Sequence, residues 1–218
     1  SLRDIDMAIA SGFDMRINLK TLLRHTTAEL GADAAGILLL NPTLNLLEYA
    51  AGHGFKTRGI EHSSLMVGEG HAGRAAIRRE LVQVADLNEN PAEFQRLRLL
   101  AGEGFVCYFG VPLIAKGMIK GVLEIFHRSP LNPNQDWFDL LHTLAGQAAI
   151  AIENAQLFGN LQQSNMGLLQ AYHSTIEGWS RALDLRDKET EGHTLRVTDM
   201  ALRLGKKFGL RDEELKYM

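Results

Sequence analysis

The chain has a single cysteine, Cys107, so no disulfide can form within it, which suits a reducing cytosol. It has no block of lysine and arginine, and its formal net charge is −3, so we expect no nucleic-acid partner. Apolar runs such as 148–152 are far shorter than the ~20 residues that cross a bilayer, and no signal peptide is visible. These absences predict a cytoplasmic protein that binds no membrane.

The ends of the chain predict that it is a piece of a longer protein. It begins at Ser1 rather than at a methionine, and it ends at Met218 within a helical pattern. Its 218 residues suffice for one large or two modest domains.

Apolar residues recur at alternating spacings of four and three from Trp137 to Leu183, with no intervening proline. This period is typical of a coiled coil, and we expect a homodimer through this C-terminal helix. The residues that we expect in the dimer seam include Leu144, Phe158, Leu169, Tyr172, Ile176 and Trp179. A continuous helix is the favoured interpretation. The alternative is a break between 159 and 167 or after Trp179, because three glycines each cost about 1 kcal/mol in a helix, namely Gly159, Gly167 and Gly178.

The preceding part of the chain predicts an α+β fold. Alternating and apolar runs indicate strands over 36–40, 46–51, 64–67, 81–84, 105–115 and 118–127. Helical patterns occur over 17–30, 71–79 and 91–100. The turn at Lys116-Gly117 would join the last two strands as a hairpin, so we expect an antiparallel sheet flanked by helices.

Five segments of this part resemble a GAF domain: AGILLL (35–40), MVGEGHAGR (66–74), GFVCYFGVPL (104–113), GVLEI (121–125) and LAGQAAIAIENA (144–155). GAF domains are regulatory, and the resemblance implies a cupped antiparallel sheet with a small-molecule pocket on one face. On the other face it implies N- and C-terminal helices that usually dimerise. We therefore expect a helical lead-in over 1–16, a sensory GAF domain over 17–155 and a connecting coiled-coil helix over 156–183.

The resemblance implies an unidentified small-molecule ligand. The helix expected from His71 would offer free backbone N–H groups to an anion, although the glycines before it could serve only to shape the turn. Cys107 would need exposure and a lowered pKa to act as a redox sensor, and a lone cysteine in an apolar strand is more often an inert core residue. The candidate pocket residues are His71, Arg74, Phe105, Cys107 and Phe126.

The tail, RDKETEGHTLRV (186–197) in particular, resembles the opening of an HD-GYP domain over 184–218. Such domains are metal-dependent phosphodiesterases that linearise cyclic di-GMP. The resemblance implies that His193 and Glu189 are metal ligands, and an imidazole with a carboxylate suits the iron or manganese expected in a complete domain. The alternative is that His193 is a surface histidine near a helix start.

The rest of such a site is missing from this sequence. It contains no His-Asp dipeptide and no Gly-Tyr-Pro, and two ligands cannot hold a catalytic metal cluster. We therefore expect this chain to have no enzymatic activity and no cofactor of its own. The favoured hypothesis is a sensory GAF module that controls an attached cyclic di-GMP phosphodiesterase in bacterial signal transduction. The alternatives are a sensor attached to another HD-superfamily metal phosphohydrolase, and a ligand-free dimerisation scaffold.

Overall fold

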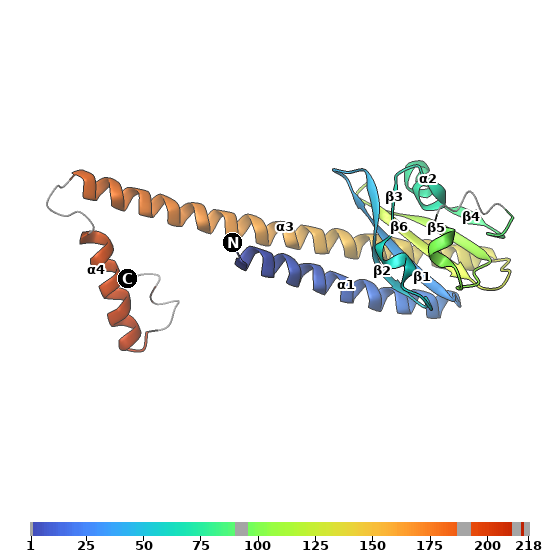
Figure 1. Ribbon diagram of the computed structural model, residues 1–218, viewed down its shortest axis with the longest axis horizontal. Helices are drawn as coiled ribbons and strands as arrows, with labels where there is room; N and C mark the ends of the chain where they lie inside the picture. Colours follow the sequence, from blue (N-terminus) through green and yellow to red (C-terminus); the bar gives the residue numbers. More distant parts are fainter. Residues whose placement is uncertain (1, 90–95, 187–192, 211–214, 216–218) are drawn as a thin grey trace. The chain divides into compact units, whose positions relative to one another are not determined.

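A computed structural model describes residues 2–89, 96–186, 193–210 and Leu215 (Figure 1). The chain divides into two compact units, Ser1–Gly159 and Asn160–Met218. The first unit holds the sheet. No helix among the described residues is long and apolar enough to cross a membrane.

Six antiparallel strands form one sheet in the order β3-β2-β1-β6-β5-β4, so β1 and β6 lie at its centre. The hairpin of β5 and β6 is closed by Lys116 and Gly117, whose φ angles are 49° and 74°. Two positive φ values match a type I′ turn, which fits the twist of a two-residue hairpin. The predicted α+β fold with an antiparallel sheet is confirmed. The strands are β1 (Ala34–Asn41), β2 (Leu46–His53), β3 (Ser64–Met66), β4 (Val82–Val84), β5 (Cys107–Ala115) and β6 (Met118–His127).

Two helices cover one face of the sheet, α1 (Leu2–Leu30) and the first part of α3 (Gln135–Arg186) (Figure 1). They share one core cluster with alternate residues of β5. The indole N–H of Trp137 donates to the carbonyl of Leu30 at 3.0 Å, which joins the start of α3 to the end of α1. The members that carry this packing include Leu19 and Leu23 from α1, Phe109, Val111 and Leu113 from β5, and Leu141, Ala148 and Ile152 from α3.

The opposite face of the sheet is covered by α2 (Gly70–Arg78) and by two short 3-10 helices, η1 (Gly59–His62) and η3 (Leu97–Leu100). Two further core clusters lie on this side. One is aromatic and includes Phe105, Tyr108 and Phe126, and the other packs small α2 residues on Leu38 and Val122. The sheet therefore separates an aliphatic helix-facing core from a more aromatic one.

Helix α3 is continuous over its 52 residues, so no break occurs at its glycines. It starts at a side-chain cap, because the backbone N–H of Trp137 donates to Asn134 Oδ1 at 3.0 Å. The expectation for Leu144 was wrong. Its side chain is buried in the helix-facing core of its own unit, so it cannot face a partner chain.

Candidate functional site

A buried polar cluster lies on the α2 side of the sheet, centred on Glu124 in the central strand β6. The Tyr108 hydroxyl donates to Glu124 Oε1 at 3.0 Å, and Arg96 forms an ion pair with the same oxygen. Arg96 also donates to Ser63 Oγ at 3.4 Å. Glu124 and Tyr108 are fully buried and Arg96 is nearly so, so the ion pair lies in a region of low dielectric.

Two tyrosines remain protonated at neutral pH, Tyr108 of the polar cluster and Tyr49 of β2, which packs against the same aromatic core. Burial raises the pKa of Tyr108 well above its usual range, and the charge of Glu124 raises it further. Burial, followed by the charge of Glu61, raises the pKa of Tyr49 to about 12, and Glu124 contributes to the same shift. The Tyr108 hydroxyl is therefore a hydrogen-bond donor to the carboxylate.

The second carboxylate oxygen, Glu124 Oε2, is buried and has no hydrogen-bond donor among the residues that the structure describes. A buried acceptor without a donor costs about 1–3 kcal/mol, and more when the group is charged. Such atoms are rare in folded proteins, and a bound water molecule or a ligand can supply the missing donor.

Aromatic rings extend from this cluster along the same face of the sheet. The ring centroids of Tyr108 and Phe126 are 5.3 Å apart, and those of Phe126 and Phe105 are 4.8 Å apart. On its other side, Tyr108 lies 5.5 Å from the ring of His71, which contacts the guanidinium of Arg74. Apolar walls with a few buried polar groups are typical of small-molecule sites.

Four of the five sequence-predicted pocket residues therefore form one chain of contacts through Tyr108: Arg74, His71, Phe126 and Phe105. Cys107 is the exception and corrects our expectation. Its side chain lies in the helix-facing core, because neighbouring strand residues point to opposite faces. Its thiol donates to the carbonyl of Ala85 at 3.1 Å, as expected for an inert core cysteine.

Sequence reasoning missed the residues at the centre of the cluster, Glu124, Arg96, Tyr108 and Ser63. A signal for Glu124 was present, since it is a lone charge in the apolar strand sequence GVLEIF (121–126). Charged residues are almost never fully buried unless they are paired, so this position called for a partner. The partner, Arg96, lies 28 residues away in the sequence, and no local pattern indicates it.

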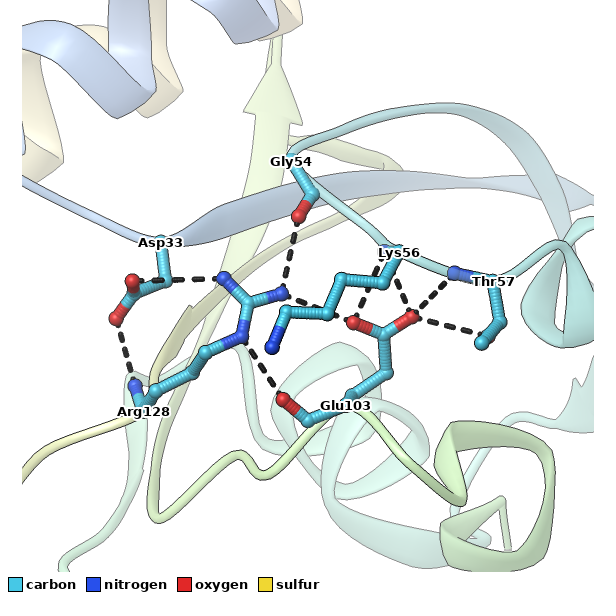
Figure 2. A network of polar contacts seen from close by, with 6 residues as sticks. All are labelled: Asp33, Gly54, Lys56, Thr57, Glu103 and Arg128. Atoms are coloured by element: carbon cyan, nitrogen blue, oxygen red, sulfur yellow. Dashed lines mark hydrogen bonds and ion pairs between the residues drawn. The ribbon is translucent and has the colours of Figure 1, made fainter.

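A second buried carboxylate, Glu103, lies in the network shown in Figure 2, and it is fully paired. The backbone N–H groups of Lys56 and Thr57 donate to it at 2.7–3.0 Å, and Arg128 donates to its Oε2 at 2.9 Å. Burial raises the pKa of Glu103, but these hydrogen bonds outweigh it and hold the pKa below its usual range. Arg128 also contacts Asp33 and the carbonyl of Gly54. The network joins four loops and leaves no oxygen of Glu103 without a donor, so its role is structural.

Strand β6 also contacts α3 through the side chain of a residue at a β-bulge. Leu113 pairs with Gly121 and Ile114 pairs with Ile119, so Lys120 is an extra residue in β6. A bulge turns the side chain of the extra residue, and Lys120 forms an ion pair with Glu153 of α3. It also donates to Gln156 at 3.4 Å. Glu124 therefore lies four residues from a direct polar link to α3.

Five of the six seam residues have exposed side chains, and Trp179 is the most exposed at 71%. An apolar face of this extent is typical of an interaction site. The five residues are Phe158, Leu169, Tyr172, Ile176 and Trp179.

Of the two expected metal ligands, His193 is the first residue of α4 (His193–Lys207), and Glu189 lies outside the described residues. Within the described ranges, no three His, Cys, Asp or Glu side chains gather as a metal site would require. The described residues by themselves therefore do not make a complete iron or manganese site.

The family model described as "GAF domain" matches residues 14–153, and the chain belongs to the GAF domain family, whose members are sensory and regulatory domains of signalling proteins. No curated protein matches the chain. Among solved structures, the GAF domain of a phosphoenolpyruvate-protein phosphotransferase from Coxiella burnetii is 22% identical, with a TM-score of 0.60 over 73% of this chain and 96% of that one.

Two further solved structures have the same fold. The GAF domain of the corresponding phosphotransferase from Acinetobacter is 20% identical, with a TM-score of 0.57 over 73% of this chain and 96% of that one. A GAF domain/HD domain protein from Geobacter sulfurreducens is 15% identical, with a TM-score of 0.57 over 66% of this chain and 95% of that one. These likenesses support the GAF fold.

Proposed function

We propose that the chain is the sensory and connecting part of a bacterial cytoplasmic protein in which a GAF domain controls an HD-GYP phosphodiesterase. The observation that carries the proposal is one uninterrupted helix, α3, that begins on the GAF sheet and ends at Arg186. The HD-GYP-like motif RDKETEGHTLRV begins at that same residue. A continuous helix is a direct mechanical connection between a sensor and an output domain.

The link between the sheet and α3 supports a route for the signal. Glu124 and Lys120 are on one strand, β6, and Lys120 pairs with Glu153 of α3. The hydrogen bonds and charge of the lysines lower the pKa of Glu153, so this carboxylate is ionised at neutral pH. A shift of β6 on ligand binding would change this contact and reposition α3.

The exposed seam of α3 supports a homodimer. Two copies that pack their seams together would bury these side chains in a coiled coil. Gln162 and Asn165 place polar residues in the seam, which costs stability but restricts the register of the two helices. A parallel pair would deliver the signal to two output domains at once.

Helix α4 supports an attached helical domain. It exposes the apolar residues Val197, Met200 and Leu204, whose spacing places them on one helix face, and the exposed Phe208 follows the helix directly. The remaining helices of an HD-type domain would cover this face. The name of the Geobacter sulfurreducens relative combines the same two domain types. In the complete domain, His193 and Glu189 would be ligands of iron or manganese, and the other ligands would come from outside this chain.

The test extends the protein along its natural reading frame and measures hydrolysis of cyclic di-GMP with iron or manganese. We expect activity in the extended protein, loss of it in His193→Ala, and none in the present chain. The control is His173→Ala, which changes an exposed histidine of α3 and should leave activity intact.

Two other outcomes would redirect the proposal. If a folded, metal-loaded extended protein hydrolyses another phosphoester but not cyclic di-GMP, the output is a different HD-superfamily phosphohydrolase. If it hydrolyses none and no small molecule stabilises the GAF unit, the chain is a dimerisation scaffold.

A further inference from the structure

We propose that Glu124 is the anchor of the GAF ligand site and that the site takes a small neutral molecule with an N–H donor, such as a carboxamide. This inference rests on the sensory role proposed above and adds the chemical class of the ligand. The site consists of Glu124, Tyr108, Arg96 and Ser63, with Phe126 and His71 beside them.

The geometry of Glu124 specifies a donor rather than an acceptor. Oε1 already receives the Tyr108 hydroxyl and the Arg96 guanidinium, whereas Oε2 receives no donor from the described part of the chain. A carboxylate oxygen can only accept, so the group that binds at Oε2 must carry N–H or O–H.

The contrast with Glu103 shows that this fold can satisfy a buried carboxylate completely when its role is structural. Glu103 receives backbone, hydroxyl and guanidinium donors from Lys56, Thr57 and Arg128, spread over both of its oxygens. Glu124 is buried to the same extent, yet one oxygen is left to an outside donor.

The charges favour a neutral ligand. Arg96 already balances the carboxylate charge within the cluster, and Arg74 adds a further positive charge near Tyr108. A cationic ligand would add another positive charge to a buried site where Arg96 already compensates the Glu124 carboxylate, and it would lose its hydration as well. A neutral N–H donor satisfies Oε2 without that cost.

The neighbouring rings favour a ligand with a flat or apolar part. Tyr108 and Phe126 are fully buried and line the same face of the sheet as Glu124. A polar head held by a buried carboxylate, with an apolar body against aromatic rings, is the usual division of a small-molecule pocket.

The experiment compares matched probes on the whole chain, acetamide against acetone and benzamide against acetophenone. Each pair has a similar shape, and only the amide has an N–H donor. Binding is followed by NMR titration of ring-labelled tyrosines, with the Tyr108 signal assigned from Tyr108→Phe. We expect the amide of at least one pair to shift the Tyr108 signal and to bind about tenfold or more tightly than its ketone, since the hydrogen bond goes to a charged acceptor.

The variant Glu124→Gln sharpens the test. Its amide oxygen would take the place of Oε1 beside the Tyr108 and Arg96 donors, so its N–H₂ would take the place of Oε2. The preference should then reverse toward the ketone. Glu48→Gln, at an exposed position of β2, is the matched control and should keep the wild-type preference.

The wild-type comparison decides the proposal even if Glu124→Gln fails to fold. Equal binding of amide and ketone in both pairs, or no shift of Tyr108 by either amide, would overturn it and leave a water molecule as the partner of Oε2. Binding is measured on this chain alone. A negative result therefore leaves the phosphodiesterase test untouched, and a failure of that test leaves the ligand result standing.

Discussion

The two units of the chain differ in the burial of their large apolar side chains. In the first unit, leucine, isoleucine and phenylalanine side chains fill three buried clusters on the two faces of one sheet. In the second, apolar side chains of α3 and α4 such as Leu168, Trp179 and Leu204 are mostly exposed. The first unit therefore has packed cores of its own, whereas the second exposes an apolar surface of the kind found at interaction sites.

The largest expected effect separates a buried leucine from an exposed one. Leu123→Ala in β6 should lower the free energy of unfolding by about 2–5 kcal/mol, because it leaves a cavity in the core. Leu168→Ala in α3 should change it by less than about 0.5 kcal/mol. Urea denaturation followed by Trp137 fluorescence, in a Trp179→Phe background, measures both. Similar losses from the two variants would contradict the division into units.

The next comparison uses two arginine ion pairs. Arg128→Met should cost the first unit about 1.5–3 kcal/mol, because it removes donors from the buried Glu103. Arg203→Met breaks an exposed pair with Asp199 and should cost no more than about 0.5 kcal/mol. Thermal melts of both variants would show whether the network in Figure 2 is structural. An Arg128→Met protein as stable as the parent would exclude that role.

The seam can be tested by placing a charge on it. Leu169→Asp should raise the dissociation constant of the proposed dimer about tenfold or more, because the carboxylate would be buried between two helices. Ala171→Asp, on the opposite side of α3, should have little effect. Sedimentation equilibrium measures the dissociation constant of each variant. Equal constants for the two variants would show that the seam faces solvent. Leu144→Asp should instead unfold the GAF core.

Acid should weaken the first unit through His127. Burial lowers the pKa of this imidazole, and Asp33 only partly opposes that shift. The unfolded chain therefore binds the proton more readily. The stability due to neutral His127 is fully present above its ordinary pKa of 6.5 and is lost as the pH falls from there toward the lower folded value.

The slope from this one group is at most about 1.4 kcal/mol per pH unit. Denaturation of His127→Gln at several pH values should show a smaller slope between pH 6.5 and the folded pKa. His173→Gln, in exposed α3, should keep the parent slope. Equal pH slopes for all three proteins would show that His127 is not the source of the acid sensitivity.

The smallest effects concern glycines in helices. Gly159→Ala and Gly167→Ala in α3 should each favour the helix by about 1 kcal/mol, since the added methyl meets no atom within 4 Å. Gly73→Ala in α2 should destabilise instead, because its Cβ would lie 2.6 Å from the carbonyl oxygen of Met66. Circular dichroism melts report the sign of each change. A loss of helicity in the α3 variants would favour a functional bend there.

Local patterns predicted most of the fold because strands and turns depend on neighbouring residues. The paired turn residues Lys116 and Gly117 and the alternation on either side of them predicted the β5–β6 hairpin with its observed bounds of Cys107–Ala115 and Met118–His127 to within about two residues. The helix α3 was equally visible in the spacing of its apolar residues. In both cases the information lies within a few residues along the chain.

It was harder to predict which face of a strand or helix is buried in the core. Cys107 and Leu144 were both assigned to surfaces that they do not reach, and both lie in the helix-facing core. A run of consecutive apolar residues, as in β5, does not show which alternate positions face the helices. The exposed outer part of α3 shares its period with the buried inner part, so the period alone could not show where the core ends.

The sequence by itself determined the antiparallel sheet and the long helix, since these depend on local spacing and on turn residues, and its five motifs carried the resemblance to the GAF family. Only the tertiary structure decided that Glu124 meets Arg96 and Tyr108, that Glu103 is fully paired, and that Lys120 reaches Glu153 across a bulge. Each of these contacts joins residues that are distant in the sequence. Their pairing depends on which strands and helices the folded core brings together, and no local pattern carries that information.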